Sequence, residues 1–240
     1  MNPQAGQRNG RNCIFINNSR FGGIRNIIVP SLNTVKLFYD FKMASKDRIQ
    51  RMKDDTRCNI LSASLDIVKE EGWAALSMRK IADKIEYTAP IIYGYFENKE
   101  AILKELTRNG YVKLAEQLEE AKSKVTDPAQ RLEAMWRAYW HFAFSEKELY
   151  QVMYGVEMSC ASANTCQVSQ KPAIMLKEQI AELIPEAKKT AAYIDIRYYT
   201  FWSVVHGLIS INLTKQLVSD EITQQVLKDA IGGMINAIKN

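Results

Sequence analysis

The sequence of 240 residues has little of what metal sites, disulfide scaffolds and β-sheets require. It contains two histidines, four cysteines without paired metal spacing, 11 glycines and six prolines. Imidazole and thiolate donors are too few for a metal site, and cysteines without a secretory context favour a reduced, cytoplasmic compartment. No Ser-His-Asp set, phosphate loop or paired-carboxylate pattern is present either, so we expect neither a cofactor nor an enzyme.

A long hydrophobic run is also missing. The longest stretch without charge covers residues 198–214, and it contains Ser203, His206, Ser210 and Asn212. A helix that spans a membrane needs about 20 predominantly apolar residues. This stretch therefore predicts a buried helix and no membrane partner.

Basic charge is in excess at only one end of the chain. Residues 1–42 hold six Lys and Arg against one Asp, whereas residues 43–240 hold 26 basic and 26 acidic residues. The formal net charge of +5 is therefore no evidence for a nucleic-acid partner. Any contact with DNA must come from the local placement of charge.

The same end is rich in Asn, Gly and Arg and lacks a sustained apolar period. It leads into Met43-Ala44-Ser45-Lys46, which is typical of a translation start. We therefore expect residues 1–42 to be a disordered extension or the product of a mis-set start. The alternatives are a transit peptide and a basic arm, because both share its acid-poor, Arg-bearing composition.

From Met43 onward, apolar residues recur with a helical period while glycine and proline fall at the joints, which predicts an all-α fold. Pro172 and Pro185 are expected to punctuate the helices in the second half of the chain. The other expected helices cover residues 56–71, 78–85, 89–96, 99–124, 128–145, 147–160, 188–215 and 220–239.

Two short helices carry the functional signal. The first has Ser77 as its N-cap and an apolar stripe at i, i+3, i+4 and i+7 from Met78. Three residues join it to a second helix, which has Thr88 as its N-cap and Pro90 in its first turn. This spacing is that of a helix-turn-helix, whose second helix enters the major groove of DNA.

The amino-acid sequence of this motif resembles that of a known family. Residues 77–96, SMRKIADKIEYTAPIIYGYF, and the following Glu97-Asn98-Lys99-Glu100 resemble the amino-terminal signature of TetR-family transcriptional regulators. The resemblance is close over residues 54–114 and looser beyond them. It implies a three-helix DNA-binding domain at residues 43–100, joined to a helical effector-binding and dimerisation domain at residues 101–240.

The second helix of the motif divides into two faces. Ile92 and Phe96, four residues apart, are expected to pack on the first helix and hold the second in place. On the other face, Ile91 or Ala89 can meet a thymine methyl, tyrosine hydroxyls can reach phosphates, and Gly94 permits close approach. Each nearby lysine is as readily a solvated surface residue as a phosphate ligand. The predicted DNA-binding residues are Arg79, Lys80, Thr88, Ala89, Pro90, Ile91, Tyr93, Gly94, Tyr95 and Lys99.

Two residues depart from the family pattern. Glu86 stands in the turn where the family usually has Gly or Asn, and a positive φ there would strain it while its charge repels phosphate. Ala89 replaces a longer polar residue, so specificity leans on apolar contacts and DNA shape. Further local charge is expected to follow the DNA backbone at Lys84, Lys46, Arg48, Arg51, Lys53 and Arg57.

Aromatic residues and methionines gather in the helices after residue 128. Such a cluster is more often plain core than a pocket, because methionine fills gaps, yet cavities between helices are lined by the same residue types. We expect a pocket for a small hydrophobic effector, lined by Trp136, Tyr139, Trp140, Tyr150, Met153, Tyr154, Met158 and Met175.

The helix expected at residues 188–215 is apolar nearly all round and so needs burial on both faces. Its segment from Trp202 to Gly207 resembles the carboxyl-terminal Trp-His-Gly signature of one branch of the TetR family. His206 is expected to be a hydrogen-bonded core or interface residue and not a ligand. With the last helix, this segment suits a homodimer interface at Trp202, Val205, His206, Gly207, Ile209, Ile231 and Met234.

Together these features predict a ligand-responsive transcriptional regulator, a repressor by resemblance, that binds double-stranded DNA at a pseudo-palindromic operator as a homodimer. Two alternatives stay open. One is a helical small-molecule binder or enzyme without DNA recognition, which Glu86 and Ala89 favour, and the other is an adaptor that uses the apolar carboxyl-terminal helices. Cys160 and Cys166 flank a polar segment and fit either inert thiols or a thiol sensor.

Overall fold

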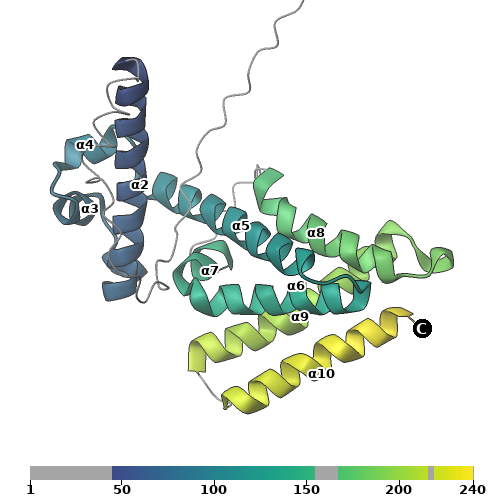
Figure 1. Cartoon of the computed structure of the whole chain (residues 1–240). Coiled ribbons are helices and arrows are strands. Elements are labelled where there is room, and N and C mark those ends of the chain that lie inside the picture. Colours follow the sequence, from purple (N-terminus) through teal and green to yellow (C-terminus); the bar gives the residue numbers. More distant parts are fainter. Residues whose placement is uncertain (1–44, 155–166, 216–218, 240) are drawn as a thin grey trace, which may run out of the picture. The chain divides into compact units, whose positions relative to one another are not determined.

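The computed structural model describes residues 45–154, 167–215 and 219–239, which form helices joined by short turns, with no strand among them (Figure 1). The predicted all-α fold is confirmed. No helix in these ranges combines the length and the apolar character that crossing a membrane requires. The helices are α2 (Ser45–Glu71), η1 (Trp73–Ala75), α3 (Met78–Lys84), α4 (Ala89–Tyr93), α5 (Lys99–Ser123), α6 (Pro128–Ser145), α7 (Lys147–Tyr154), α8 (Gln167–Leu183), η3 (Glu186–Lys188), α9 (Ala191–Lys215) and α10 (Asp220–Lys239), where η marks a 3-10 helix.

The chain divides into two compact units, residues 1–102 and 103–240, and the division falls inside α5. Unit 1 contains α2, η1, α3, α4 and the first residues of α5, and unit 2 contains the remaining helices. The extension predicted at residues 1–42 lies outside the described residues, as do Met158, Cys160 and Cys166.

Unit 1 is held together by apolar side chains from its three α-helices. Ile60 on α2, Ile81 on α3 and Ile92 on α4 are completely buried. The side chain of Ser77 caps α3, as predicted, by accepting a hydrogen bond at 3.2 Å from a backbone N–H one turn later. Gly72, whose φ of 82° lies in the left-handed region, ends α2.

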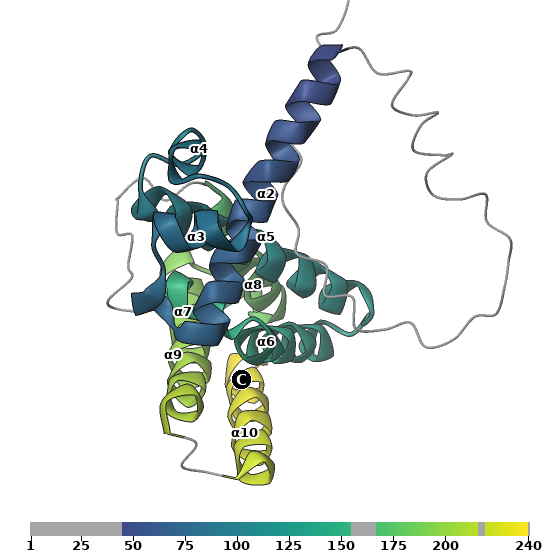
Figure 2. The ribbon, with the colours of Figure 1, turned by 90° about the vertical axis from the view of Figure 1, so that its left-hand side faces the viewer.

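Helix α6 is at the centre of unit 2, where it contacts α7, α8, α9 and α10. Figures 1 and 2 show α9 and α10 running side by side. The indole of Trp136 on α6 stacks on Phe201 of α9, with ring centroids 5.4 Å apart. Helix α6 begins where the sequence predicted, because Asp127 accepts a hydrogen bond at 2.9 Å from the N–H of Gln130 and Pro128 fills the first turn.

Helix α2 begins eleven residues before the helix predicted at residue 56. The basic segment expected ahead of the first helix therefore lies within α2. Side-chain pairs one turn apart support this polar extension, since the amide of Gln50 donates to the carboxylate of Asp54 at 2.9 Å. The prediction missed it because the segment has no apolar period.

Pro172 lies inside α8, although the sequence predicted that it would separate helices. A proline ring removes one backbone hydrogen bond from a helix. Met175 and Ile180 on the same helix are buried, however, and such tertiary packing outweighs local propensity. Pro185 stands just ahead of η3, and α9 then starts at Ala191.

Thiols and other metal-binding groups do not gather in the part of the chain that the structure describes. No group of three or more His, Cys, Asp and Glu side chains is placed there to hold a metal ion.

Candidate nucleic-acid interface and ligand cavity

Helices α3 and α4 are joined by a tight turn in which Glu86 has a φ of 59°. The N–H of Tyr87 bonds back to the carbonyl of Ala82 at 2.9 Å, which closes the end of α3. A left-handed conformation costs a residue with a Cβ about 1–2 kcal/mol. The strain anticipated for Glu86 is therefore present.

The side chains of α4 differ sharply in burial. Ile92 is completely buried and Phe96 is 3% exposed, so both anchor the helix within unit 1. Ile91 is 41% exposed and Tyr93 is 54% exposed, and Tyr87 in the preceding turn is 43% exposed. Adjacent large apolar and aromatic groups at this exposure, in a polar setting, are typical of a contact surface.

Helix α4 is shorter than the sequence predicted. It ends at Tyr93, where the N–H of Gly94 is shared between the carbonyl of Pro90 at 3.2 Å and the carbonyl of Ile91 at 3.0 Å. Gly94 itself has an ordinary helical φ of −69°, and a Cβ would lie 3.1 Å from the Ile91 carbonyl oxygen. Glycine is therefore favoured here because the Ile91 carbonyl oxygen lies close to where a Cβ would stand, and not because the turn is left-handed.

The remaining predicted contact residues of α4 are accessible. Thr88 stands at the N-cap, but its hydroxyl makes no capping hydrogen bond, so it remains available to a phosphate. The exposed or half-buried residues that complete this surface are Thr88, Ala89, Pro90, Gly94 and Tyr95.

Two of the three basic residues of α3 form ion pairs with acidic residues of α2. Lys80 pairs with Glu71, and Lys84 pairs with Glu70 at 2.8 Å. Exposed pairs of this kind contribute little in water, so a phosphate can replace either carboxylate. Arg79 is exposed and has no ion pair with another described residue. All three residues therefore remain candidates for phosphate contacts.

Two other basic residues do not face outward as predicted. Lys99 is half-buried and donates a hydrogen bond to the carbonyl oxygen of Trp73 at 3.1 Å, which ties α5 to η1. The guanidinium of Arg57 lies 4.8 Å from the ring centroid of Phe96. Both cations therefore hold unit 1 together, because their partners lie within the unit.

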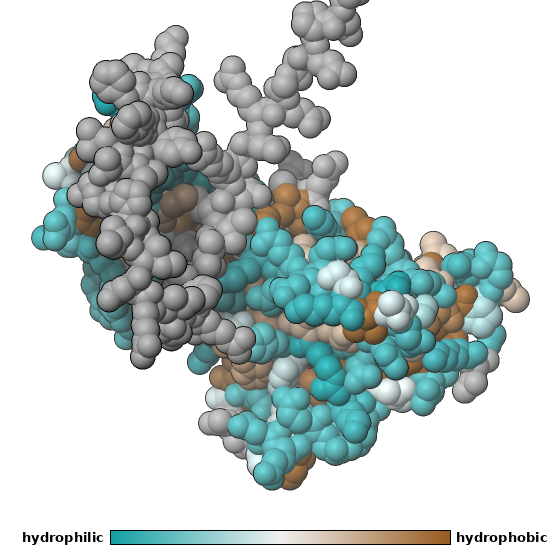
Figure 3. Space-filling model, viewed as in Figure 1, coloured by the Kyte–Doolittle hydropathy of each residue, from teal (hydrophilic) through white to brown (hydrophobic). Residues whose placement is uncertain are grey.

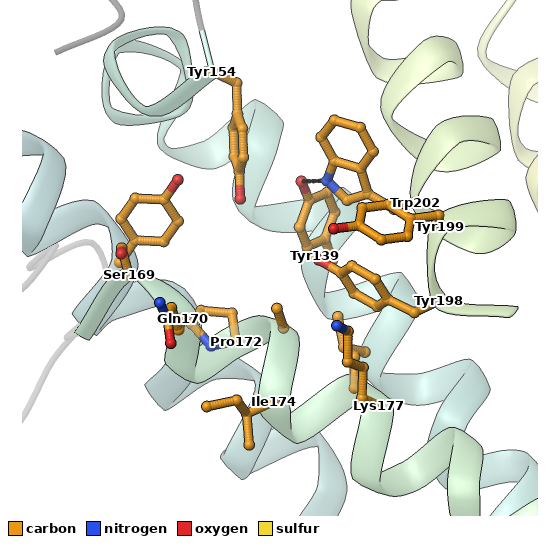
Figure 4. A pocket seen from close by; sticks show the side chains of 13 residues that line it. Tyr139, Tyr154, Ser169, Gln170, Pro172, Ile174, Lys177, Tyr198, Tyr199 and Trp202 are labelled. Carbon is orange, nitrogen blue, oxygen red and sulfur yellow. Dashed lines mark hydrogen bonds between the residues drawn. The ribbon is translucent and has the colours of Figure 1, made fainter. Parts of the chain in front are cut away.

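A cavity of about 420 Å³ lies in unit 2, lined by residues of α5, α6, α7, α8 and α9 (Figure 4). Helix α8 contributes a largely aliphatic wall that includes Pro172 and Ile174. In Figure 4 the hydroxyl of Tyr154 points into the space between the walls. The aromatic wall consists of Tyr111, Tyr139, Tyr154, Tyr198, Tyr199 and Trp202.

The tyrosines of this wall are held in their protonated form. Burial raises the pKa of Tyr139 and of Tyr154 well above the ordinary value for a phenol, and burial raises the pKa of Tyr198 to about 12. The indole N–H of Trp202 donates to the Tyr139 hydroxyl at 3.2 Å. At neutral pH these hydroxyls therefore keep their protons, and those of Tyr139 and Tyr154 hydrogen-bond to each other.

Lys177 of α8 is the charged residue among the described residues that line the cavity. Its Nζ lies 2.7 Å from a carboxylate oxygen of Asp195, which is not part of the lining. The same Nζ lies 5.1 Å and 5.6 Å from the ring centroids of Tyr198 and Tyr199. Aromatic faces and one acid thus stabilise this ammonium.

A stripe of apolar side chains is exposed on α9 and α10. Gly207 and Gly233 lie on these helices, and no other atoms approach within 4 Å of where a Cβ would stand, so the surface beside them is open. Figure 3 shows hydrophobic patches interrupting a mainly hydrophilic face where these helices lie. The members of the stripe are 40% to 59% exposed, and they are Ile196, Val204, Ile211, Ile222 and Val226.

Two sequence models of one family match the chain. The model for bacterial regulatory proteins of the tetR family matches residues 60–106. The model for the tetracyclin repressor-like C-terminal domain matches residues 132–232, so the two together span more than half of the chain. The chain belongs to the TetR family.

Individual relatives share part of the sequence or the fold with this TetR-family chain. The HTH-type transcriptional activator FasR of Mycolicibacterium smegmatis is 24% identical over 102 residues, which are 42% of this chain and 47% of that protein. The match thus spans about half the length of FasR. A protein of unknown function from Rhodococcus superimposes with a TM-score of 0.66 at 18% identity, over 77% of this chain and 95% of that one. The regulator FadR of Bacillus subtilis, solved with stearoyl-CoA, has a TM-score of 0.56 at 17% identity, over 73% and 97% of the respective chains.

Two of the residues predicted for an effector pocket, Tyr139 and Tyr154, line the cavity of this TetR-family protein. Of those that do not line it, Trp140 lines a second cavity together with His141 and Phe144. The others are buried core, and they are Trp136, Tyr150, Met153 and Met175. The prediction for the pocket named none of the residues on the α8 and α9 walls. The aromatic spacing of Tyr198 and Trp202, four residues apart, was the available signal.

The residues predicted for a dimer interface fall into two groups. Val205, Ile209 and Ile231 are completely buried within the subunit, so they offer no surface to a second copy. Gly207 and Met234 are half-buried beside the apolar stripe of α9 and α10. The prediction failed for the first group because a helix that is apolar all round does not reveal which face its own subunit covers.

The other two predicted interface residues belong to the aromatic cluster of unit 2. Trp202 lines the cavity, and the ring of His206 stacks on its indole with centroids 4.7 Å apart. The Nδ1 of His206 shares a hydrogen bond with the Tyr150 hydroxyl. Burial lowers the pKa of His206, so its neutral form is favoured.

Proposed function

We propose that this chain is a ligand-responsive transcriptional regulator that binds a pseudo-palindromic operator as a homodimer, with α4 as the recognition helix. The observation that carries the proposal is the exposure of Ile91 and Tyr93 on a helix that Ile92 anchors. An exposed isoleucine can pack on a thymine methyl, and a tyrosine hydroxyl can donate to a phosphate. The family assignment favours this function over a helical binder or enzyme without DNA recognition.

Affinity for DNA in this proposal comes from a small number of cations. Arg79 is exposed on α3, and Lys80 needs only to exchange its partner Glu71 for a phosphate. Each phosphate contact releases counterions and adds about 0.9 to the slope of log affinity against log salt. Because the charge outside the first 42 residues is balanced, we expect a modest slope.

Dimerisation in this proposal uses the apolar stripe of α9 and α10. Two helices from each of two copies can form a four-helix interface, and glycines 207 and 233 permit close approach. Two recognition helices related by the two-fold axis would then meet successive major grooves about 34–36 Å apart. We also infer that Trp202, His206 and Gly207 mark the family branch with the Trp-His-Gly signature.

The cavity of unit 2 is the proposed effector site. Helix α5 carries the chain from unit 1 into unit 2 and contributes Tyr111 to the lining, so it is the element through which a ligand can act on α4. A coupling of about 1–3 kcal/mol changes DNA affinity by about 5- to 150-fold. Release of a repressor by a hydrophobic effector is proposed from the family resemblance, and the ligand of the FadR structure supports a partly hydrophobic molecule.

A gel-shift assay with the DNA upstream of the chain's own gene tests the proposal. We expect a sequence-specific complex that weakens with salt and that is lost in the double variant Ile91→Ala/Tyr93→Ala. Phe144→Ala is a matched control, because Phe144 is an exposed aromatic residue of unit 2 at 38%. Absence of specific binding by the wild type would favour a small-molecule binder without DNA recognition. Sedimentation as a monomer would instead favour the adaptor.

A further inference from the structure

The charges around the cavity of unit 2 favour an anion. Lys177 lines the cavity, and none of the described residues of the lining is an acid. The partner of Lys177, Asp195, lies outside the lining with 51% of its side chain exposed. A negative group in the cavity can therefore bind the ammonium while water solvates Asp195.

The neutral polar groups of the cavity include hydrogen-bond donors. Burial raises the pKa of Tyr111 as well as that of Tyr154, so both phenols keep their protons at neutral pH. Figure 4 shows the Tyr154 hydroxyl directed toward the interior, where it also hydrogen-bonds with the hydroxyls of Tyr139 and Tyr111. These groups suit a ligand that carries acceptor oxygens.

The two walls of the cavity suit a planar body. Tyr198 and Trp202 present aromatic surface on one side, and Pro172 of α8 presents aliphatic surface on the other (Figure 4). An aromatic ring gains from both, because rings stack or meet edge to face and bury a large apolar area. A flexible alkyl chain would gain only the burial of its apolar surface.

A cationic ligand does not fit this site. In an aromatic cage the faces of the rings take the ammonium of the ligand. Here the Nζ of Lys177 already lies 5.1 Å and 5.6 Å from the centroids of Tyr198 and Tyr199. A second cation would displace this ammonium or be repelled by it.

The volume indicates how much of a ligand the cavity can surround. At the packing density of protein interiors, a cavity of about 420 Å³ encloses roughly 15 to 20 non-hydrogen atoms. A coenzyme A thioester has several times that number. The cavity therefore does not enclose a ligand like the one in the FadR structure.

We propose that the cavity binds a planar aromatic carboxylate, with the carboxylate on Lys177 and the ring between α8 and the Tyr198–Trp202 wall. This inference deepens the proposed function, on which it rests for taking the cavity as the effector site. Asp195 competes with the ligand for the same ammonium and so sets the affinity.

Titration calorimetry on the purified full chain tests the ligand class with four probes of similar size. These are naphthalene-2-carboxylate, its neutral amide, dodecanoate and 2-naphthylmethylammonium. We expect the aromatic acid to bind about tenfold or more tightly than its amide, since a charge-assisted hydrogen bond is lost in the amide. Equal or tighter binding of the amide, the ammonium or dodecanoate would overturn the proposal.

Three variants test the position of the carboxylate. Lys177→Gln should abolish the preference for acid over amide, and Lys171→Gln should not, because Lys171 is exposed on α8 outside the lining. Asp195→Asn should strengthen binding of the acid by about 3- to 10-fold, because the competing carboxylate is gone. Unfolding cannot produce such a gain. An unchanged or weaker affinity in Asp195→Asn would refute the placement on Lys177.

The same probes separate this inference from the proposed function. If the aromatic acid binds as expected but leaves the protein–DNA complex intact in the gel shift, the effector role fails and the ligand class stands. If dodecanoate or the amide releases DNA and the acid does not, the effector role stands and the ligand class fails.

Discussion

Replacing Glu86 with glycine should stabilise the protein. The φ of 59° at this position costs a residue with a Cβ about 1–2 kcal/mol. Glycine has no such cost but loses about 0.5–1 kcal/mol more backbone entropy on folding. The difference is a gain of about 0.5–1 kcal/mol, which for a chain of this length raises the melting temperature by about 1–4 °C.

Thermal unfolding followed by circular dichroism measures this change, and Glu86→Gln is the matched control. Glutamine removes the charge but keeps the Cβ and the strain, so its melting temperature should equal that of the wild type. Both variants should bind DNA more tightly, because an acid beside the proposed phosphate contacts is removed. A glycine variant that melts lower than the wild type would refute the reasoning, because glycine destabilises ordinary positions.

Three further predictions concern the core and the pH dependence. Ile92→Ala should lower the free energy of unfolding in urea by about 2–5 kcal/mol, and Ile91→Ala should change it by less than about 0.5 kcal/mol; equal costs would mean that α4 does not have the two faces described. Gly110→Ala should cost about 1–3 kcal/mol by overpacking, because its Cβ would meet the Met153 side chain, with Cγ at 3.0 Å, whereas Gly232→Ala should cost nothing; similar losses in both would contradict the close approach of α5 and α7. Because burial lowers the pKa of His206, the unfolded chain binds a proton below about pH 6.5 that the folded chain does not. Stability should therefore fall as pH drops from 7 to 5, and more steeply in the wild type than in His206→Gln, and parallel curves would show that His206 does not contribute.

Local signals in the sequence were sufficient for much of unit 1. Ser77 marked the start of α3, the spacing from Met78 marked its buried face, and Ile92 and Phe96 were correctly expected to be buried. The strain at Glu86 was also visible, because the family pattern has glycine or asparagine in the turn. Each of these features depends on residues within one or two helical turns.

The details of unit 2 depend on contacts between distant segments, and there the sequence was less informative. The aromatic residues of α6 and α7 were expected to form core or to line a pocket, but which ones face the cavity depends on where α8 and α9 pack. The sequence did not single out Lys177 as a cavity residue, because an isolated lysine is usually solvated. Its position over Tyr198 and Tyr199 is set only by the packing of α8 on α9.

The lengths of two helices also depended on more than periodicity. Helix α2 extends to Ser45 through polar residues that pair with one another, and α8 continues through Pro172 because its neighbours are buried. A search for apolar period and helix breakers finds neither effect.

The central claim is that two copies of α4, one from each subunit of a dimer, recognise DNA. Footprinting of the purified protein on genomic DNA tests this claim most directly. The account predicts two protected half-sites on one face of the duplex with centres about one helical turn apart. It also predicts that Ile91→Ala/Tyr93→Ala loses this protection while Phe144→Ala keeps it. Protection that ignores sequence, or an unchanged footprint in the double variant, would contradict the claim.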